Sequence, residues 1–440
     1  FKHVTLMLKI IIKTIIIFGM VISSCTGDIA DQPNIILIMA DDMGYECLGV
    51  NGSISYETPV LDRLAEEGIR FTNCYAQPLC TPSRVKIMTG KYNYRNYEEF
   101  GYLNEKELTF GSIMKEAGYE TAIVGKWQLN GLAYDMPGFD DNTRPYRFGF
   151  DEYCLWQLTV KGNKGSRYAK PVIEENGELL RFDIDSYGPD IFTDFIVDYI
   201  VRKRDKPFFI YYPMVLVHDP FVPTPDSDRW SEPDLRLKGN KQYFADMVAY
   251  TDKLVGKIVK QLKMEGIYEN TILIFTGDNG TGRAITSETT WGPVKGFKGN
   301  TTDAGTRVPL IINWPDRMKE SSVYEGLVDF ADFMPTLADI AGRDVQSDGL
   351  SLLPLLKGEE RGEKEKIFIH YDPRWNKNVS QYRNQFARTL EYKLYQDGRF
   401  YYLPDDVLEL NPLDSNVLDG KQIAIRQKLQ ELINSAPAWE

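Results

Sequence analysis

Residues 34–42 read Asn34-Ile35-Ile36-Leu37-Ile38-Met39-Ala40-Asp41-Asp42, an apolar run that ends in two adjacent aspartates. A continuous apolar run is typical of a parallel strand buried on both faces, because a strand with one wet face alternates apolar and polar residues. Open α/β sheets bind their ligands beyond the carboxyl ends of the strands. The stretch therefore predicts an α/β fold with Asp41 and Asp42 at a functional edge of the sheet.

Three later segments have the same organisation, a short buried strand followed by a charged or polar side chain. They are residues 120–125 before Lys126, residues 207–212 shortly before His218, and residues 271–276 before Asp278 and Asn279. Each feature alone also fits a helix cap or an ordinary turn. Their joint occurrence predicts that these side chains meet at one edge of the sheet.

Cys80 opens the run Cys80-Thr81-Pro82-Ser83-Arg84, and Gly90 follows it. Pro82 in a first turn and Gly90 near a C-cap predict a short helix. A free cysteine is most often a small core residue. The beginning of a helix, however, presents free backbone N–H groups and the positive end of the helix dipole, which favour an anion. The position therefore favours a chemical role for Cys80 over a packing role.

The composition is that of a folded, acidic protein. Among 440 residues, 51 are Lys or Arg and 63 are Asp or Glu, which gives a formal net charge of −12. Nucleic-acid binding needs a basic surface, so we expect no nucleic-acid partner. An anionic substrate would need a local cluster of cations. A basic loop could attract a polyanion, although a solvated loop is the preferred interpretation of its residues Lys161, Lys164, Arg167 and Lys170.

Residues 1–25 have the pattern of a secretory signal. Basic residues accompany an apolar run that leads into Ile22-Ser23-Ser24-Cys25, which resembles a bacterial lipobox. This pattern predicts an exported protein, a periplasmic or cell-surface lipoprotein that lipid on Cys25 attaches to a membrane. A plain signal peptide is the alternative, and the run is short for a membrane anchor helix.

Together these motifs resemble the type I, formylglycine-dependent sulfatases of the alkaline phosphatase superfamily, as an exported bacterial member. The matching stretches are Asp41-Asp42, Cys80 to Arg84, Gly125-Lys126-Trp127, His218 to Phe221, Gly277 to Gly280, and Lys298-Gly299 with Gly305 to Pro309. The resemblance implies an α/β fold with a large mixed, mostly parallel sheet flanked by helices, and a small C-terminal antiparallel sheet with a helix. The change of pattern near residue 345 predicts a catalytic domain at 33–345 and a C-terminal subdomain at 346–440.

The resemblance also implies a metal site. Its ligands would be Asp41, Asp42, Asp278, Asn279 and the modified Cys80. Oxygen ligands suit hard divalent cations, so we expect Ca²⁺ as the first choice and Mg²⁺ as the second. The chain has only 3 histidines, which argues against a histidine-rich two-zinc site. A formylglycine-generating maturation enzyme would be the partner that converts Cys80 to formylglycine.

The catalytic residues that the resemblance implies are Cys80, Arg84, Lys126, His218 and Lys298. The aldehyde hydrate made from Cys80 would attack the sulfur, and Arg84 would hold its hydroxyl. Lys126 and Lys298 would contact the sulfate, and His218 would protonate the leaving alcohol. The expected substrate-binding residues are Lys126, His218, Lys298, Gln128, His370 and Arg374. Ordinary packing is the alternative for the further candidates, which are Trp127, Trp291 and Trp375.

Gln128 departs from the pattern of the family, which usually has histidine at this position to take a proton when sulfate is released. Glutamine forms hydrogen bonds but exchanges no proton near neutral pH. Three interpretations stay open: another group or water acts as the base, the step is slower, or turnover is lost. Asp303 is a smaller departure, because many relatives have glutamate there and a carboxylate is kept.

The expected function is hydrolysis of a sulfate ester on a sulfated carbohydrate, although an aryl sulfate would fit the same core. A phosphodiester or phosphonate hydrolase of the same superfamily is one alternative. A non-catalytic binder of sulfated glycans is another, and Gln128 is its only support in the sequence.

Overall fold

The computed structural model describes residues 32–162, 165–318, 321–362, 364–375, 382–437 and 439. The predicted signal segment with Cys25 lies outside these residues, and so does Lys164. The chain from Pro33 to Glu440 forms one compact unit. Within the described part, no helix has the length and hydropathy of a membrane span.

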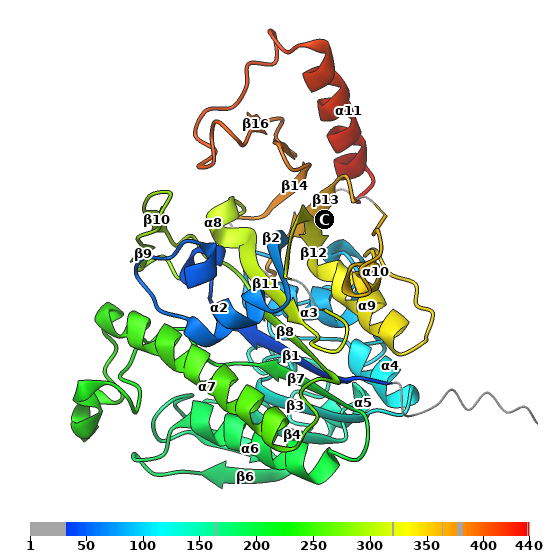
Figure 1. Cartoon of the computed structure of the whole chain (residues 1–440). Helices are drawn as coiled ribbons and strands as arrows, with labels where there is room; N and C mark the ends of the chain where they lie inside the picture. The colour runs from blue at the N-terminus through cyan, green and yellow to red at the C-terminus, as the bar shows by residue number, and fades with distance from the viewer. Residues whose placement is uncertain are drawn as a thin grey trace, which may run out of the picture. The chain divides into compact units, whose positions relative to one another are not determined.

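A sheet of 10 strands runs through this unit in the order β12-β2-β11-β8-β1-β7-β3-β4-β5-β6 (Figure 1). The strands are β1 (Asn34–Ala40), β2 (Ile69–Tyr75), β3 (Glu120–Lys126), β4 (Glu152–Trp156), β5 (Val172–Glu175), β6 (Glu178–Arg181), β7 (Phe208–Pro213), β8 (Thr271–Gly277), β11 (Arg307–Asn313) and β12 (Ser322–Asp329). The centre is parallel, since β1 pairs with β7 and β8, and β3 pairs with β7 and β4. Antiparallel pairs join β11 to β2 and β8, and β5 to β4 and β6. The predicted mixed, mostly parallel sheet is confirmed.

The first strand is as buried as its sequence predicts. No residue from Ile35 to Ala40 is more than 1% exposed. Successive side chains of a strand point to opposite faces. Accordingly, Ile36 and Ile38 belong to one hydrophobic core, and Ile35 and Leu37 belong to the other.

Helices cover both faces of the sheet (Figure 1). One core contains side chains of α2 (Pro59–Glu66), α6 (Gly188–Lys203) and α7 (Phe244–Met264). The opposite core contains side chains of α3 (Cys80–Thr89), α4 (Phe110–Glu116) and α9 (Phe333–Ile340). Three single-turn helices complete the described set of α-helices in this region: α5 (Arg144–Arg147), α8 (Asp303–Thr306) and α10 (Leu353–Leu356). This two-sided covering leaves the ends of the strands as the place where loops can form a site.

Helix α3 begins at Cys80 and ends before Gly90, as predicted. Gly90 has φ of 66°, and its backbone N–H donates to the carbonyl of Lys86, so glycine suits this left-handed cap. The Nζ of Lys86 lies 2.7 Å from Oδ1 of Asp329, and both side chains are fully buried. Breaking a buried pair of this kind is costly, because the remaining charge loses its partner. The pair therefore fixes the helix that carries Cys80 to the end of β12.

The C-terminal part forms a separate antiparallel sheet of 4 strands in the order β13-β14-β15-β16. Its elements are β13 (Ile367–Tyr371), β14 (Asn384–Arg388), β15 (Tyr392–Tyr395), β16 (Phe400–Tyr402) and the helix α11 (Gly420–Asn434). A further pair of short strands, β9 (Thr286–Ser287) and β10 (Val294–Lys295), lies between β8 and α8. The predicted small sheet and terminal helix are confirmed, and the domain boundary at residue 345 stays a prediction.

A buried ionic cluster joins the small sheet to α8. Asp303 lies 2.7 Å from Arg388 of β14, and Lys393 of β15 lies 2.7 Å from Glu409. Burial by itself would raise the pKa of Asp303, but Arg388 and Lys393 lower that pKa to about 2. The carboxylate of Asp303 thus forms part of this structural contact.

Candidate active site

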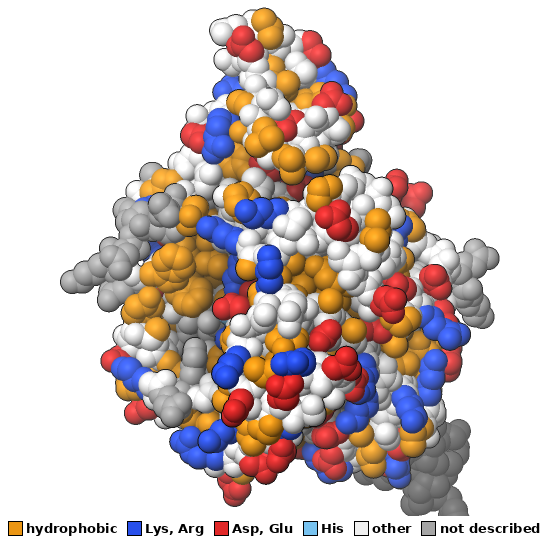
Figure 2. Space-filling model, turned by 90° about the vertical axis from the view of Figure 1, so that its left-hand side faces the viewer, with side chains coloured by type: hydrophobic (Ala, Val, Ile, Leu, Met, Phe, Trp, Pro, Cys, Tyr) orange, Lys and Arg blue, Asp and Glu red, His pale blue; other side chains and the backbone are white. Residues whose placement is uncertain are grey.

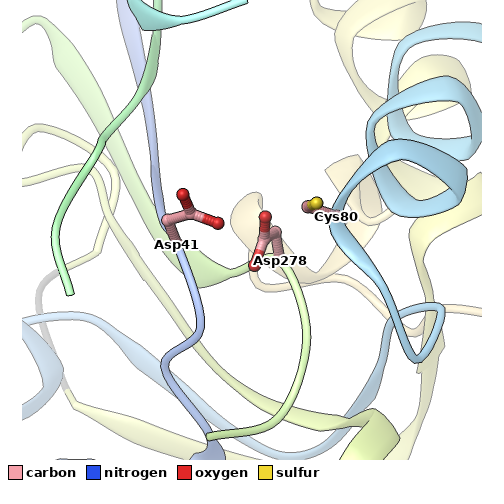
Figure 3. A group of neighbouring side chains, drawn as sticks. All are labelled: Asp41, Cys80 and Asp278. Carbon is pink, nitrogen blue, oxygen red and sulfur yellow. The ribbon is translucent and has the colours of Figure 1, made fainter. Parts of the chain in front are cut away.

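The predicted site residues meet at the carboxyl edge of the parallel strands. Ala40 of β1 pairs with Gly277 of β8, so Asp41 and Asp278 leave the sheet side by side. Figure 3 shows their carboxylates pointing into a common space that Cys80 reaches from the first turn of α3. One ligand atom from each of these three residues lies within 4.8 Å of the others. All three side chains are buried.

Asp41 is surrounded by cations. Lys126, the last residue of β3, places its Nζ at 3.0 and 2.8 Å from the two carboxylate oxygens. Arg167 contributes a contact of 3.3 Å, and Arg84 one of 3.8 Å. Burial by itself would raise the pKa of Asp41, but these cations, Lys126 first, hold that pKa well below its ordinary value. The carboxylate is therefore ionised at neutral pH.

Asp42 connects a second group of polar side chains. The Nζ of Lys298 lies 2.6 Å from Oδ2 of Asp42, and Nδ2 of Asn279 donates to Oδ1 at 2.9 Å. The backbone N–H of Asp42 donates to Asp278 at 3.0 Å. Asp42 has φ of 63°, a strained value for a residue other than glycine. Such strain is often found at functional sites, where the surroundings hold the residue in place.

The oxygen atoms of this cluster fit a hard divalent cation. Burial and the neighbouring Asp41 carboxylate raise the pKa of Asp278 to about 7, although Arg84 lies 3.1 Å away. The Oδ1 of Asn279 is buried and has no hydrogen-bond partner among the described residues. Crowded carboxylates beside an unused amide oxygen are a donor set that Ca²⁺ and Mg²⁺ prefer. The predicted ligands Asp41, Asp42, Asp278 and Asn279 are thus brought together.

Cys80 has the neighbours that the sequence analysis expected. Its Sγ donates to Oε1 of Gln128 at 3.1 Å, so Gln128 lies beside the predicted nucleophile. Gln128 has φ of 55°, another left-handed residue at this site. Arg84, one turn along α3, donates from Nη1 to the carbonyl of Lys126 at 3.0 Å. This arrangement places the thiol between the carboxylates and the glutamine side chain.

His218 lies on the open side of the cluster. Its Nε2 is 3.7 Å from Oδ2 of Asp42, and its Nδ1 is 2.7 Å from the backbone carbonyl of Asp219 and 2.9 Å from Oδ1 of the same residue. A proton on Nδ1 satisfies both oxygens, and it leaves Nε2 facing the site. The contact with His218 lowers the pKa of Asp219 to about 2. His218 is therefore oriented to exchange a proton through Nε2.

A cavity of about 450 Å³ opens beside Asp42 and Lys298. It is lined by Asp42, Leu79, Asp219, Phe221, Gly282, Arg283, Ala284, Lys298, Gly299, Tyr371, Trp375 and Tyr382. Several of these side chains are aromatic, and three come from the part of the chain after residue 370. On the face of the molecule drawn in Figure 2, hydrophobic side chains gather beside Lys and Arg side chains. The C-terminal part thus helps to form the entrance to the site.

The predicted substrate contacts have different environments. Trp375 lines the cavity, whereas His370 and Arg374 do not. His370 is 6% exposed, its Nδ1 accepts from Gln385 at 3.0 Å, and burial lowers its pKa to about 3. Trp127 is a core side chain that is 1% exposed, and Trp291 donates to the carbonyl of Asn51 at 3.3 Å. The substrate-binding roles of His370 and Arg374 stay predictions.

Arg167 is a further cation beside Asp41, and no motif in the sequence indicates this position. It was expected in a solvated loop, but it is 9% exposed and its guanidinium lies 4.2 Å from the centre of the Trp156 ring. Stacking on an aromatic ring stabilises a partly desolvated guanidinium. Lys161 of the same loop is exposed and pairs with Asp135. No spacing or motif distinguishes the two cations, because the difference arises from the tertiary position of Trp156.

Comparison with known proteins identifies the family. The sulfatase family model matches residues 33–343, and the model of N-sulphoglucosamine sulphohydrolase, C-terminal, matches residues 298–436. N-acetylgalactosamine-6-sulfatase of Canis lupus familiaris is 31% identical in an alignment of 390 positions that covers 80% of this chain and 72% of that protein. Arylsulfatase J of Mus musculus is 30% identical in an alignment of 365 positions that covers 79% of this chain and 59% of that protein.

The fold is similar to that of solved sulfatase structures. BT4656 in complex with its substrate D-glucosamine-2-N,6-O-disulfate superimposes with a TM-score of 0.71, at 24% identity, over 92% of this chain and 97% of that one. The sheet order and the buried cluster define a site of carboxylates and cations at the carboxyl edge of an α/β sheet. With the family match, the chain belongs to the sulfatases, a family of sulfuric ester hydrolases in the alkaline phosphatase superfamily.

Replacement of Arg167 tests its role at Asp41. We expect Arg167→Gln to lower kcat/KM for a sulfate ester by roughly tenfold or more, because a hydrogen bond to a charged group contributes about 1.5–3 kcal/mol. Steady-state sulfate release measures the effect. The control is Lys161→Gln, which removes an exposed cation of the same loop. Equal activity of the two variants would show that Arg167 has no part in the site.

Proposed function

We propose that this protein hydrolyses a sulfate ester on a sulfated carbohydrate, with a formylglycine made from Cys80 as the nucleophile. The observation that supports the proposal is the position of Cys80. Its side chain lies at the first turn of α3, within reach of two buried carboxylates and beside a group of cations. An aldehyde hydrate at this position would find its oxygens close to the groups that can orient it.

A Ca²⁺ ion, with Mg²⁺ as the second choice, is the cofactor in this proposal. Asp41, Asp42, Asp278, Asn279 and the oxygen of the modified Cys80 would hold it. A bound divalent cation supplies positive charge that helps to bind the sulfate and to orient the nucleophile.

Amino-acid side chains would carry out the remaining steps of the reaction. Lys126 and Lys298 carry positive charge to the site, and Asp42 raises the pKa of Lys298 above its ordinary value despite burial. Both lysines would stabilise the charge that develops on the sulfate oxygens. Arg84 would hold the nucleophile, and Nε2 of His218 would give a proton to the leaving alcohol.

A sulfated sugar suits the cavity next to this cluster. Phe221, Tyr371, Trp375 and Tyr382 form aromatic walls, and Arg283 adds a cation. Aromatic rings offer apolar faces to a sugar ring, while their polar edges remain able to form hydrogen bonds. The solved relative BT4656 has a disulfated glucosamine as its substrate. Export as a lipoprotein attached through Cys25 would fit action on an external glycan, and it stays part of the proposal.

The alternatives have less support. The curated relatives that are about 30% identical carry the names of sulfatases, which disfavours a phosphodiester or phosphonate hydrolase. The hypothesis that the protein is a non-catalytic glycan binder is supported by Gln128 alone. Because Gln128 contacts Cys80, its replacement can test that alternative directly.

The central test combines mass and activity. In protein made with a maturation enzyme, we expect the Cys80 peptide to show exchange of sulfur for oxygen with loss of two hydrogens. Cys80→Ala should lower sulfate release by several orders of magnitude, as the loss of other catalytic nucleophiles does. Cys154→Ala, at another buried cysteine, is the control. Persistent activity of Cys80→Ala, or faster hydrolysis of a matched phosphate ester, would refute the proposal.

Metal binding can be measured without turnover. We expect Ca²⁺ to raise the melting temperature by several degrees, since a ligand at about 100 times its Kd contributes about 2.7 kcal/mol to stability. Asp278→Asn should lose this gain, because it removes a proposed carboxylate ligand of the ion. Asp228→Asn, at an exposed aspartate, should keep the gain. If neither Ca²⁺ nor Mg²⁺ changed the melting temperature, the proposed metal site would be contradicted. If Mg²⁺ raised the melting temperature more than Ca²⁺ does, Mg²⁺ would be the ion that the site binds.

Gln128→His tests the step that releases sulfate. We expect kcat to rise and its pH profile to gain a group with a pKa of about 6.5, because histidine exchanges a proton in this range. Rapid-mixing measurements of sulfate release distinguish a faster release step from faster attack. An unchanged kcat would mean that another group or water already acts as the base.

A further inference from the structure

The cavity beside Lys298 contains two polar groups that the proposed reaction does not use. They are the guanidinium of Arg283 and the hydroxyl of Tyr371, and both residues line the cavity together with Lys298. Neither position belongs to the motifs that the sequence analysis singled out. Their contacts indicate which kind of ligand they suit.

Arg283 is held in place without a negative partner. Its Nε donates to the backbone carbonyl of Lys298 at 2.8 Å, and its Nη1 donates to the hydroxyl of Tyr382 at 3.1 Å. The guanidinium also lies 4.6 Å from the centre of the Tyr382 ring. Within the described residues no carboxylate lies within ion-pair distance of Arg283, whereas Lys126 and Lys298 each contact an aspartate. Among the described residues, Nη2 of Arg283 therefore has neither a hydrogen-bond partner nor a carboxylate beside it.

Tyr371 brings a hydroxyl group from β13. The residue has no exposed surface, and its hydroxyl oxygen has no hydrogen-bond partner among the described residues. A buried hydroxyl without a partner costs free energy, so a ligand oxygen that accepts its proton would offset this cost. Burial raises the pKa of Tyr371 above its ordinary value, which keeps the hydroxyl protonated and able to donate.

The backbone of Gly299 lies beside both groups, and its unfilled side-chain position defines a narrow notch. A Cβ added at Gly299 would lie 3.2 Å from Nη2 of Arg283 and 3.9 Å from the hydroxyl oxygen of Tyr371. It would also lie 3.9 Å from Cδ2 of Leu79, the residue that precedes Cys80. The φ of Gly299 is 81°, a conformation that other residues rarely adopt. A side chain at this position would crowd Nη2 of Arg283, so the glycine keeps the notch between the two donors unfilled.

We propose that this notch over Gly299 binds a second anionic group of the substrate, a carboxylate or a second sulfate, through Arg283 and Tyr371. The inference rests on the proposed function, because it adds a specificity site to the same cavity. A planar guanidinium and a hydroxyl suit the oxygens of either anion. Arg283 and Tyr371 are then specificity-determining residues, and substrates with two anionic groups are preferred.

The position of the notch limits where the second anion lies on the substrate. Lys298 contributes its Nζ to Asp42 in the reaction site and its backbone carbonyl to Arg283. The two anion sites therefore adjoin each other in one cavity, on either side of Lys298. Adjoining sites suit substituents on the same sugar ring or on the next ring rather than groups several sugars apart.

The test compares three ligands that share one sulfate. They are N-acetylgalactosamine 6-sulfate, its 4,6-disulfate, and the 6-sulfated sugar linked to a uronic acid. Calorimetry with Cys80→Ala protein measures binding without turnover, and kcat/KM of the mature enzyme is measured alongside. We expect tighter binding of one or both ligands with two anionic groups by roughly tenfold or more. The arm that gains more identifies the second anion as sulfate or carboxylate.

Variants assign this preference to the notch. In the Cys80→Ala background, Arg283→Gln should remove the preference, Arg283→Lys should keep part of it, and Tyr371→Phe should reduce it several-fold. The melting temperature of Tyr371→Phe should not fall, because the hydroxyl has no partner to lose. Arg63→Gln, at an exposed arginine of α2, should keep the full preference.

Two outcomes overturn the inference. One is that Cys80→Ala protein with Arg283 and Tyr371 unchanged binds the three ligands equally well, or binds none of them. The other is a preference that survives Arg283→Gln and Tyr371→Phe together. Because binding is measured in a protein without the nucleophile, the inference can hold or fail independently of the proposed sulfate hydrolysis.

Discussion

The pairing register of β1 and β8 determines where the charged groups of this protein meet. Ala40 lies opposite Gly277, so the next residues, Asp41 and Asp278, place two carboxylates side by side in a buried space. Like charges at such a distance repel strongly where water is excluded. Burial, together with this repulsion, raises the pKa of Asp278. The other groups of the site compensate for this repulsion. Some are positively charged side chains, and others would help to bind a metal cation.

Compensation comes from elements that are far apart in the sequence. Lys126 ends β3, Arg84 lies on α3, and Arg167 belongs to the loop between β4 and β5. Removing one member of a buried charged group leaves the others without a partner, which is why such groups are costly to alter. The buried pair of Lys86 and Asp329 helps to keep these groups in place, because a shift of α3 would move both Cys80 and Arg84.

Much of the fold and of this inner cluster could be predicted, because both depend on local patterns. The apolar runs before Asp41 and Asp278 identify buried strands, and Pro82 and Gly90 identify the bounds of α3. Such a signal is weak in β14, since its first residues Asn384 and Gln385 are polar. Arg167 was assigned to a solvated loop because nothing near it in the sequence shows that Trp156 provides a stacking surface.

By itself, the sequence determined which chemical groups stand at the ends of the buried strands and at the first turn of α3, since strand burial and helix caps depend on neighbouring residues. Only the tertiary structure decided which distant side chains approach them. Arg167 turns toward Asp41, and Arg283 and Tyr371 both come close to Gly299, because the small C-terminal sheet and the loops after β4 and β8 pack against the site. Such contacts depend on the packing of whole elements, which no local pattern records.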